Sequence, residues 1–112
     1  MFIGEASKKT GLSIKAIRFY EEKELIRPPK RAGRYRVYQQ TDIELLILIK
    51  EAKALGVTLS QLKGVITYNN GQVNWVNIKV FLSEIREQLI DQIDDIKKKI
   101  DSLDQCYDQI NP

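Results

Sequence analysis

The last third of the chain constrains the fold most. The 36 residues from Trp75 to Ile110 include no glycine and no proline, and apolar side chains recur there in alternating steps of four and three. Two successive steps of four, from Ile85 to Ile93, interrupt this alternation. The pattern predicts one helix about 50 Å long, with a single apolar stripe and a stutter that locally unwinds a supercoil.

A helix with one apolar stripe needs an apolar partner to cover it. In so short a chain we expect that partner to be a second copy, which makes the protein a homodimer. The residues predicted at the dimer interface are Leu82, Ile85, Leu89, Ile93, Ile96, Ile100, Leu103 and Ile110.

Charge is distributed unevenly between the two halves of the chain. Residues 1–56 contain 12 basic and 7 acidic side chains, a net charge of +5, whereas residues 57–112 contain 6 and 8, a net charge of −2. At 112 residues the chain has room for one compact domain plus an extended element. The asymmetry indicates that the first half binds a polyanion and that the second half has a different function.

The composition argues against several function classes. With Cys106 as its only cysteine and no histidine, the chain lacks the usual ligands of a zinc site and the usual general base. It shows no phosphate-cradling glycine loop and no nucleophile–base pair. We therefore expect no catalytic residues, no metal, no cofactor and no enzymatic activity. Because no long apolar run or signal-peptide pattern is present, we expect a cytoplasmic protein without membrane contact.

Two short helices are predicted at the N-terminus. Ile3–Thr10 has helical apolar spacing and stops at Gly11, a natural left-handed helix end. Ser13 is a suitable N-cap for a second helix that runs toward Leu25. Two helices joined by a tight turn that contains glycine form a helix-turn-helix pattern.

A small basic hairpin, or wing, is predicted next. Pro28-Pro29 prevents the second helix from continuing, and residues 30–33 lead into Arg34-Tyr35-Arg36-Val37-Tyr38. The aromatic and β-branched residues of this second run favour a strand.

Two further helix starts follow the wing. Thr41 with Glu44 predicts a capping box for a helix that ends near Gly56, and Thr58 with Gln61 predicts another for a shorter helix. Asn69-Asn70-Gly71 indicates a turn or hinge. The predicted organisation is a mainly α winged helix-turn-helix domain (1–67), a hinge (68–74) and a dimerisation helix (75–112).

The candidate binding surface combines the second helix and the wing. Lys15 and Arg18 lie three residues apart and share one helix face, while Ile14 and Ile17 are expected on the core side. Such side chains neutralise phosphates, and a helix of this size fits the major groove. The alternative is that the basic residues form a solvated surface and the tyrosines complete a core. The order of the elements, a helix-turn-helix followed at once by a basic aromatic hairpin, favours DNA binding.

The same segments resemble the N-terminal signature of the MerR family of transcription regulators. The matching runs are Ile3-Gly4-Glu5-Ala6, Gly11-Leu12-Ser13, Ala16-Ile17-Arg18-Phe19-Tyr20-Glu21, Pro28-Pro29, Tyr35-Arg36-Val37-Tyr38 and Ala52-Lys53-Ala54-Leu55-Gly56. The long C-terminal helix is similar to that family's antiparallel dimerisation helix, here with a midpoint near Ile93.

The resemblance implies a homodimer that binds double-stranded DNA at a promoter and untwists an overlong spacer, so that RNA polymerase engages both promoter elements. It also implies DNA contacts from both elements of the candidate surface. With Arg34 added from the wing's own charge pattern, the predicted DNA-binding residues are Lys15, Arg18, Phe19, Tyr20, Arg31, Arg34, Arg36 and Tyr38.

Two positions depart from the family pattern. Glu24 stands where the family normally has the glycine that ends the recognition helix. Because Glu24 has a side chain, a left-handed backbone conformation at this position would cost roughly 1 kcal/mol. Arg34 stands where a turn glycine often precedes the tyrosine, in a wing about one residue short.

Two other functions are compatible with parts of the sequence. A small architectural winged-helix protein that bends DNA, such as an excisionase, would explain the first half but seldom needs a long dimerisation helix. A coiled-coil interaction module would explain the second half and would leave the wing as a solvated surface. Footprinting distinguishes the three functions. A symmetric protected site inside a promoter would favour the regulator, clustered direct repeats the architectural protein, and no protection the interaction module.

Overall fold

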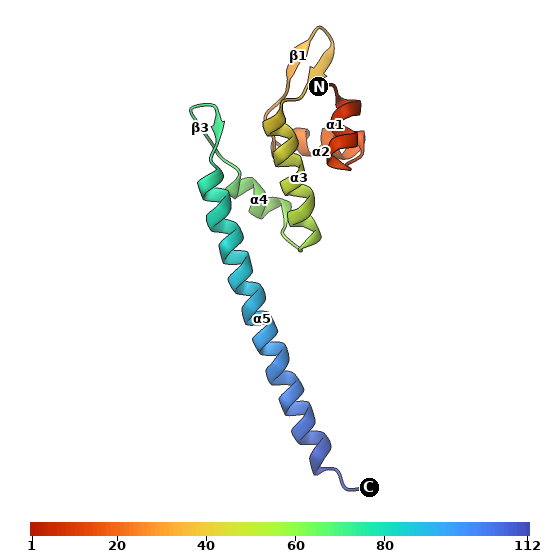
Figure 1. Ribbon diagram of the computed structural model, residues 1–112, viewed down its shortest axis with the longest axis vertical. Coiled ribbons are helices and arrows are strands. Elements are labelled where there is room, and N and C mark those ends of the chain that lie inside the picture. Colours follow the sequence, from red (N-terminus) through yellow and green to blue (C-terminus); the bar gives the residue numbers. More distant parts are fainter. The chain divides into compact units, whose positions relative to one another are not determined.

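The computed structural model describes all 112 residues and divides into two compact units, Met1–Asn74 and Trp75–Pro112. The first unit contains four helices and two small hairpins, and the second is one long helix (Figure 1). In chain order the elements are α1 (Ile3–Thr10), α2 (Ile14–Glu22), β1 (Lys30–Ala32), β2 (Tyr35–Val37), α3 (Gln40–Ala54), α4 (Leu59–Val65), β3 (Tyr68–Asn69), β4 (Gln72–Val73) and α5 (Trp75–Gln109).

The predicted helix-turn-helix is confirmed. Gly11 ends α1 in the left-handed conformation, with φ of 74°, and its N–H donates to the Ser7 carbonyl. The Ser13 hydroxyl caps α2 by accepting a hydrogen bond from the Ala16 N–H at 3.0 Å. These two local devices set the tight turn between the helices.

The C-terminus of α2 takes the strained form that its sequence predicts. Glu24 has a positive φ of 62°. Around it, the Leu25 N–H donates to the Tyr20 carbonyl and the Glu24 N–H donates to the Glu21 carbonyl, both at 3.0 Å. This pair of bonds is a Schellman motif, which turns the chain so that Leu25 enters the core.

The wing is an antiparallel hairpin of β1 and β2, with Gly33 and Arg34 as its two-residue turn. Gly33 has a φ of 63°, which a residue with a side chain rarely adopts. The N-terminus anchors the strand exit, because the Met1 amino group donates to the Tyr38 carbonyl and the Tyr38 N–H donates back to the Met1 carbonyl.

The start of α3 corrects one sequence prediction. The helix begins earlier than expected, at Gln40, and the Asp42 carboxylate accepts from the Gln39 N–H at 2.9 Å, so Thr41 and Glu44 are not its capping pair. Asp42 suits this role because a negatively charged carboxylate in the first turn also interacts favourably with the positive end of the helix dipole. The capping box of α4 is as predicted: the Gln61 N–H donates to the Thr58 hydroxyl, and the Gln61 side chain accepts from the Thr58 N–H.

The segment that was expected to be a turn or hinge forms a second hairpin, β3–β4. Asn70 and Gly71 both have positive φ, as a two-residue hairpin turn of type I′ requires.

The core of the first unit comes mainly from α2, α3 and the chain that follows α2. Its largest fully buried side chains are Tyr38, Ile17, Leu25, Ile26, Leu45, Leu46, Ile49 and Leu62.

The second unit is dominated by α5, which runs unbroken for 35 residues (Figure 1). The predicted apolar stripe is largely uncovered in the single chain: Ile96 is 55% exposed and Leu103 is 68% exposed. Ile110, the last predicted interface residue, lies just beyond the helix end, and its N–H donates to the Tyr107 carbonyl. No helix combines the length and apolar character needed to cross a membrane.

Candidate nucleic-acid interface

The exposed side of α2 carries the first half of the predicted DNA-binding surface. Lys15 and Arg18 are exposed, and Phe19 is 40% exposed. Ile17 is fully buried, as expected for the core face, but Ile14 is 38% exposed and therefore does not belong to it. Ile14 is the first helical residue, and the core is reached only one turn later. The helix presents a basic outer face and is held by an apolar inner face.

Tyr20, the fourth predicted residue on this helix, is only 8% exposed. Its ring packs edge-on against Phe19, with centroids 5.7 Å apart. Tyr20 therefore supports the exposed ring of Phe19 from within the core. The Lys23 ammonium lies 5.7 Å from the centre of the Phe19 ring and adds a cation to the same surface.

The wing has two chemically different faces. Arg31 on β1 lies opposite Arg36 on β2, so both point to one face, whereas Tyr35 pairs with Ala32 on the other. Arg31 and Arg34 are exposed, and Arg34 lies in the turn. The Phe2 ring packs against Tyr35 with centroids 5.7 Å apart, which supports the wing from the N-terminus.

Arg36 and Tyr38 both bind the carboxylate of Glu21 on α2. Arg36 Nε donates to Glu21 Oε1 at 3.1 Å and the Tyr38 hydroxyl donates to Glu21 Oε2 at 3.2 Å. The side chain of Glu21 is 12% exposed and Tyr38 is 1% exposed. The structure thus places Tyr38 in the core and Arg36 in an ion pair, whereas Arg31 and Arg34 are exposed.

The buried phenol of Tyr38 is held in its neutral form. Burial, the nearby negative charge of Glu21 and the hydrogen bond to Glu21 together raise the pKa of Tyr38 from 10.0 to about 12, against a smaller lowering by Arg36 and Arg18. The role of Glu21 was not predicted from the sequence, because nothing in the local pattern links a helix residue to a strand 15 residues later.

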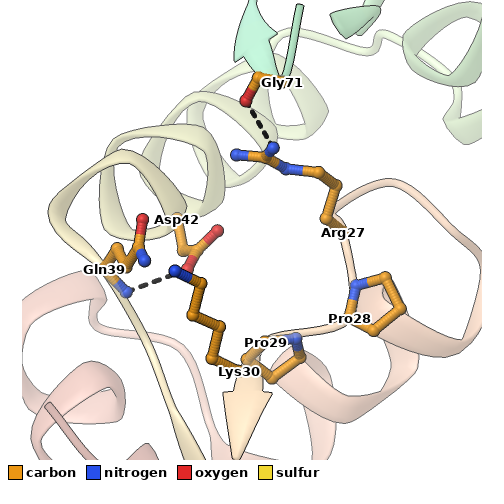
Figure 2. A pocket seen from close by; sticks show the side chains of 7 residues that line it. All are labelled: Arg27, Pro28, Pro29, Lys30, Gln39, Asp42 and Gly71. Carbon is orange, nitrogen blue, oxygen red and sulfur yellow. Dashed lines mark hydrogen bonds between the residues drawn. The ribbon is translucent and has the colours of Figure 1, made fainter.

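A pocket of about 290 Å³ adjoins the wing, and Figure 2 shows its seven lining residues. Arg27 spans it: its guanidinium donates to the Gly71 carbonyl and lies 4.3 Å from the centre of the Tyr68 ring. Arg27 therefore fastens the second hairpin to the chain that follows α2, and it is not one of the wing's free charges. The pocket lining contains cations and the Asp42 carboxylate. The lining residues are Arg27, Pro28, Pro29, Lys30, Gln39, Asp42 and Gly71.

Comparison with known proteins decides the family. Residues 1–69 match the model of the MerR HTH family regulatory proteins. This chain belongs to the MerR family. It is 32% identical over 111 residues to the HTH-type transcriptional regulator CueR of Salmonella typhi, an alignment that covers 98% of the chain and 76% of CueR. The predicted regulator, rather than an enzyme, is thereby confirmed.

Two solved MerR structures share the fold along nearly the whole chain. One is a MerR family transcriptional regulator from Listeria monocytogenes, 25% identical with a TM-score of 0.67, covering 96% of this chain and 83% of that one. The other is HiNmlR, a MerR family regulator lacking the sensor domain and bound to promoter DNA, 20% identical with a TM-score of 0.57. The second alignment covers 96% of this chain and 78% of HiNmlR, and it bears on the fold alone.

Proposed function

We propose that this MerR family protein regulates transcription as a homodimer whose two winged helix-turn-helix units bind double-stranded DNA at a promoter. One observation carries the proposal: α2 exposes Lys15, Arg18 and Phe19 while it buries Ile17 and Tyr20. A helix oriented in this way has its charged face free for the major groove and its apolar face fixed in the core.

Within this proposal the two elements have different tasks. Lys15 and Arg18 reach base edges and nearby phosphates from the groove, while Phe19 makes an apolar contact. Arg31 and Arg34 reach the flanking phosphates from the wing, where both side chains are exposed. Tyr20, Arg36 and Tyr38 hold these groups in place from the core side.

A second copy of the chain is the occupant that we propose for the apolar stripe of α5. The charges of this helix favour an antiparallel pair. Residues 75–86 contain Lys79, Arg86 and Glu84, a net charge of +1, whereas residues 100–112 contain three aspartates and no base. An antiparallel pair centred on Ile93 sets these two segments against each other. A parallel pair would instead align the acidic ends.

The dimer gives the protein its proposed mode of action. Two recognition helices held by one α5 pair bind two half-sites of a symmetric site. We propose, as the family resemblance implies, that the dimer distorts an overlong promoter spacer so that RNA polymerase engages both of its elements. HiNmlR, a MerR family regulator of the same fold, was solved bound to promoter DNA. We propose a promoter as the target of this chain as well.

Footprinting across promoter fragments tests the proposal. We expect one symmetric protected site within a promoter spacer. Arg18→Ala should weaken specific binding by roughly 1 to 3 kcal/mol without changing the fold, because it removes one charged donor from the groove. Lys98→Ala is the matched control, since it removes a charge from the face of α5 opposite the stripe. Protection of clustered direct repeats would favour the architectural function, and no protection would contradict DNA binding.

A further inference from the structure

The carboxylate of Glu21 joins the recognition helix to the wing through both of its oxygens. Oε1 accepts from Arg36 Nε at 3.1 Å, and Oε2 accepts from the Tyr38 hydroxyl at 3.2 Å. Arg36 and Tyr38 are two residues apart, so their side chains leave the same side of the extended chain. One carboxylate therefore connects α2 to Arg36 on the wing strand and to Tyr38, which directly follows that strand.

The surroundings of this carboxylate make the connection stiff. The Glu21 side chain is 12% exposed and the Arg36 side chain is 29% exposed, so water screens their charges poorly. The hydroxyl of Tyr38 comes from a residue that is 1% exposed, and both backbone polar groups of Tyr38 are bound to Met1. The wing strand consequently cannot shift along α2 without breaking an ion pair and a buried hydrogen bond.

We propose that Glu21 is a positioning residue that fixes the wing at one distance from the recognition helix, and that Arg36 acts on DNA binding through Glu21 and not by contacting a phosphate. This inference rests on the proposed function, since a fixed distance between the recognition helix and the wing allows both elements to contact the DNA at the same time. Glu21 itself does not touch DNA.

The proposal can be tested by whether removal of the Glu21 charge weakens or strengthens DNA binding. Removal of a negative charge beside a polyanion strengthens binding if charge is all that matters. It would strengthen binding further if it released Arg36 to contact a phosphate. Loss of a positioning residue instead weakens binding, because the wing and the helix no longer meet the DNA together.

The experiment compares Glu21→Gln with Glu22→Gln in the 112-residue protein on one promoter duplex. Both changes remove one negative charge from adjacent positions of α2, but Glu22 is exposed and does not bridge to the wing. We expect Glu21→Gln to weaken binding about tenfold, in line with the coupling energies of charged networks. Glu22→Gln should bind as tightly as the wild type or more tightly. Equal or tighter binding by Glu21→Gln would overturn the proposal.

A double variant tests the second half of the inference. Arg36→Gln alone should weaken binding about as much as Glu21→Gln, and the variant with both changes should bind no more weakly than either one. If the two losses multiply, Arg36 contacts DNA independently of Glu21 and that half is overturned.

A measurement without DNA separates this proposal from the proposed function. In the free protein, Glu21→Gln should speed amide hydrogen exchange in residues 30–37 selectively, while α3 and α4 keep their protection and Glu22→Gln leaves the wing unchanged. Unchanged wing exchange in Glu21→Gln would overturn the positioning role. If the wild type binds no duplex DNA, the proposed function fails, and the exchange experiment still decides whether Glu21 holds the wing.

Discussion

Arg31 lies directly opposite Arg36 across the two strands of the wing. Like charges in this position destabilise a hairpin by roughly 0.2 to 1 kcal/mol unless an anion lies near them. The Glu21 carboxylate neutralises Arg36 at 3.1 Å. Arg31 has no ion pair, and its Nη1 makes only a long 3.5 Å hydrogen bond to the Arg34 carbonyl. Arg31 is therefore the member of the pair whose charge is available to a phosphate.

Arg31→Ala should weaken binding to specific and non-specific duplexes alike and reduce the steepness of log K against log salt by about 1 per protomer, and thus by about 2 for a dimer, because each protomer releases one counterion fewer. Arg31→Lys should keep the slope, since it keeps the charge. Binding isotherms of the three proteins at several salt concentrations measure this. A loss confined to the specific site would show that Arg31 contacts a base.

The strained end of α2 gives a stability prediction. Glu24 has a φ of 62°, so Glu24→Gly should stabilise the first unit by about 1 kcal/mol. The cost of the lost ion pair is small, because Lys63 and Glu24 are 3.8 Å apart and both exposed. Urea unfolding measures the difference. Glu22→Gly, at the last residue of the same helix, is the matched control and should destabilise the first unit by up to about 1 kcal/mol. A stability loss in both variants would contradict the strain argument.

Local signals predicted the first unit well because they act within a few residues. Gly11, Ser13 and the pair Thr58–Gln61 each satisfy backbone groups of their own turn, so the sequence alone locates the helix ends. The start of α3 was misplaced because two overlapping pairs, Gln39–Asp42 and Thr41–Glu44, have the same spacing. The hairpin β3–β4 was missed although Asn70-Gly71 is a strong hairpin signal, because its strands are only two residues long.

The candidate site was predicted less completely, because burial depends on contacts between distant segments. Lys15 and Arg18 follow from helix periodicity alone. Tyr38 belongs to the core only because α2 and the N-terminus fold against it, which no local pattern reveals. Arg27 looks like another basic residue of the wing, yet it binds Gly71, 44 residues away in sequence.

The Tyr38 phenol predicts how stability changes in alkali. Its pKa is about 12 in the folded protein and near 10.0 in the unfolded chain, so the neutral form favours the folded state. This stabilisation is complete below pH 10 and is lost as the pH rises toward 12, amounting to about 3 kcal/mol in total. Tyr38→Phe cannot ionise there and should lose less stability over this range. Urea unfolding at about pH 9 and about pH 11.5 compares the two proteins, and equal losses would contradict the prediction.

The stripe on α5 predicts how the protein assembles. Ile96 and Ile100 are 55% and 51% exposed in the single chain, and pairing with a second copy would bury both. Changing both to Asp would place unpaired charges inside the proposed dimer interface, which is strongly unfavourable. Sedimentation should then show a monomer or an unfolded chain, and DNA binding should fall because two half-sites are no longer held together.

The matched control adds two aspartates elsewhere on the same helix. Ser102 and Gln105 are exposed, and Gln105 lies on the face opposite Leu103 and Tyr107. Ser102→Asp with Gln105→Asp should remain dimeric and bind DNA nearly as tightly as the wild type. If the variant with Ile96→Asp and Ile100→Asp stayed dimeric as well, the apolar stripe would not be the dimer interface. If both variants became monomeric, added negative charge alone would explain the loss, and the interface would have to be mapped by apolar-to-alanine changes along the stripe.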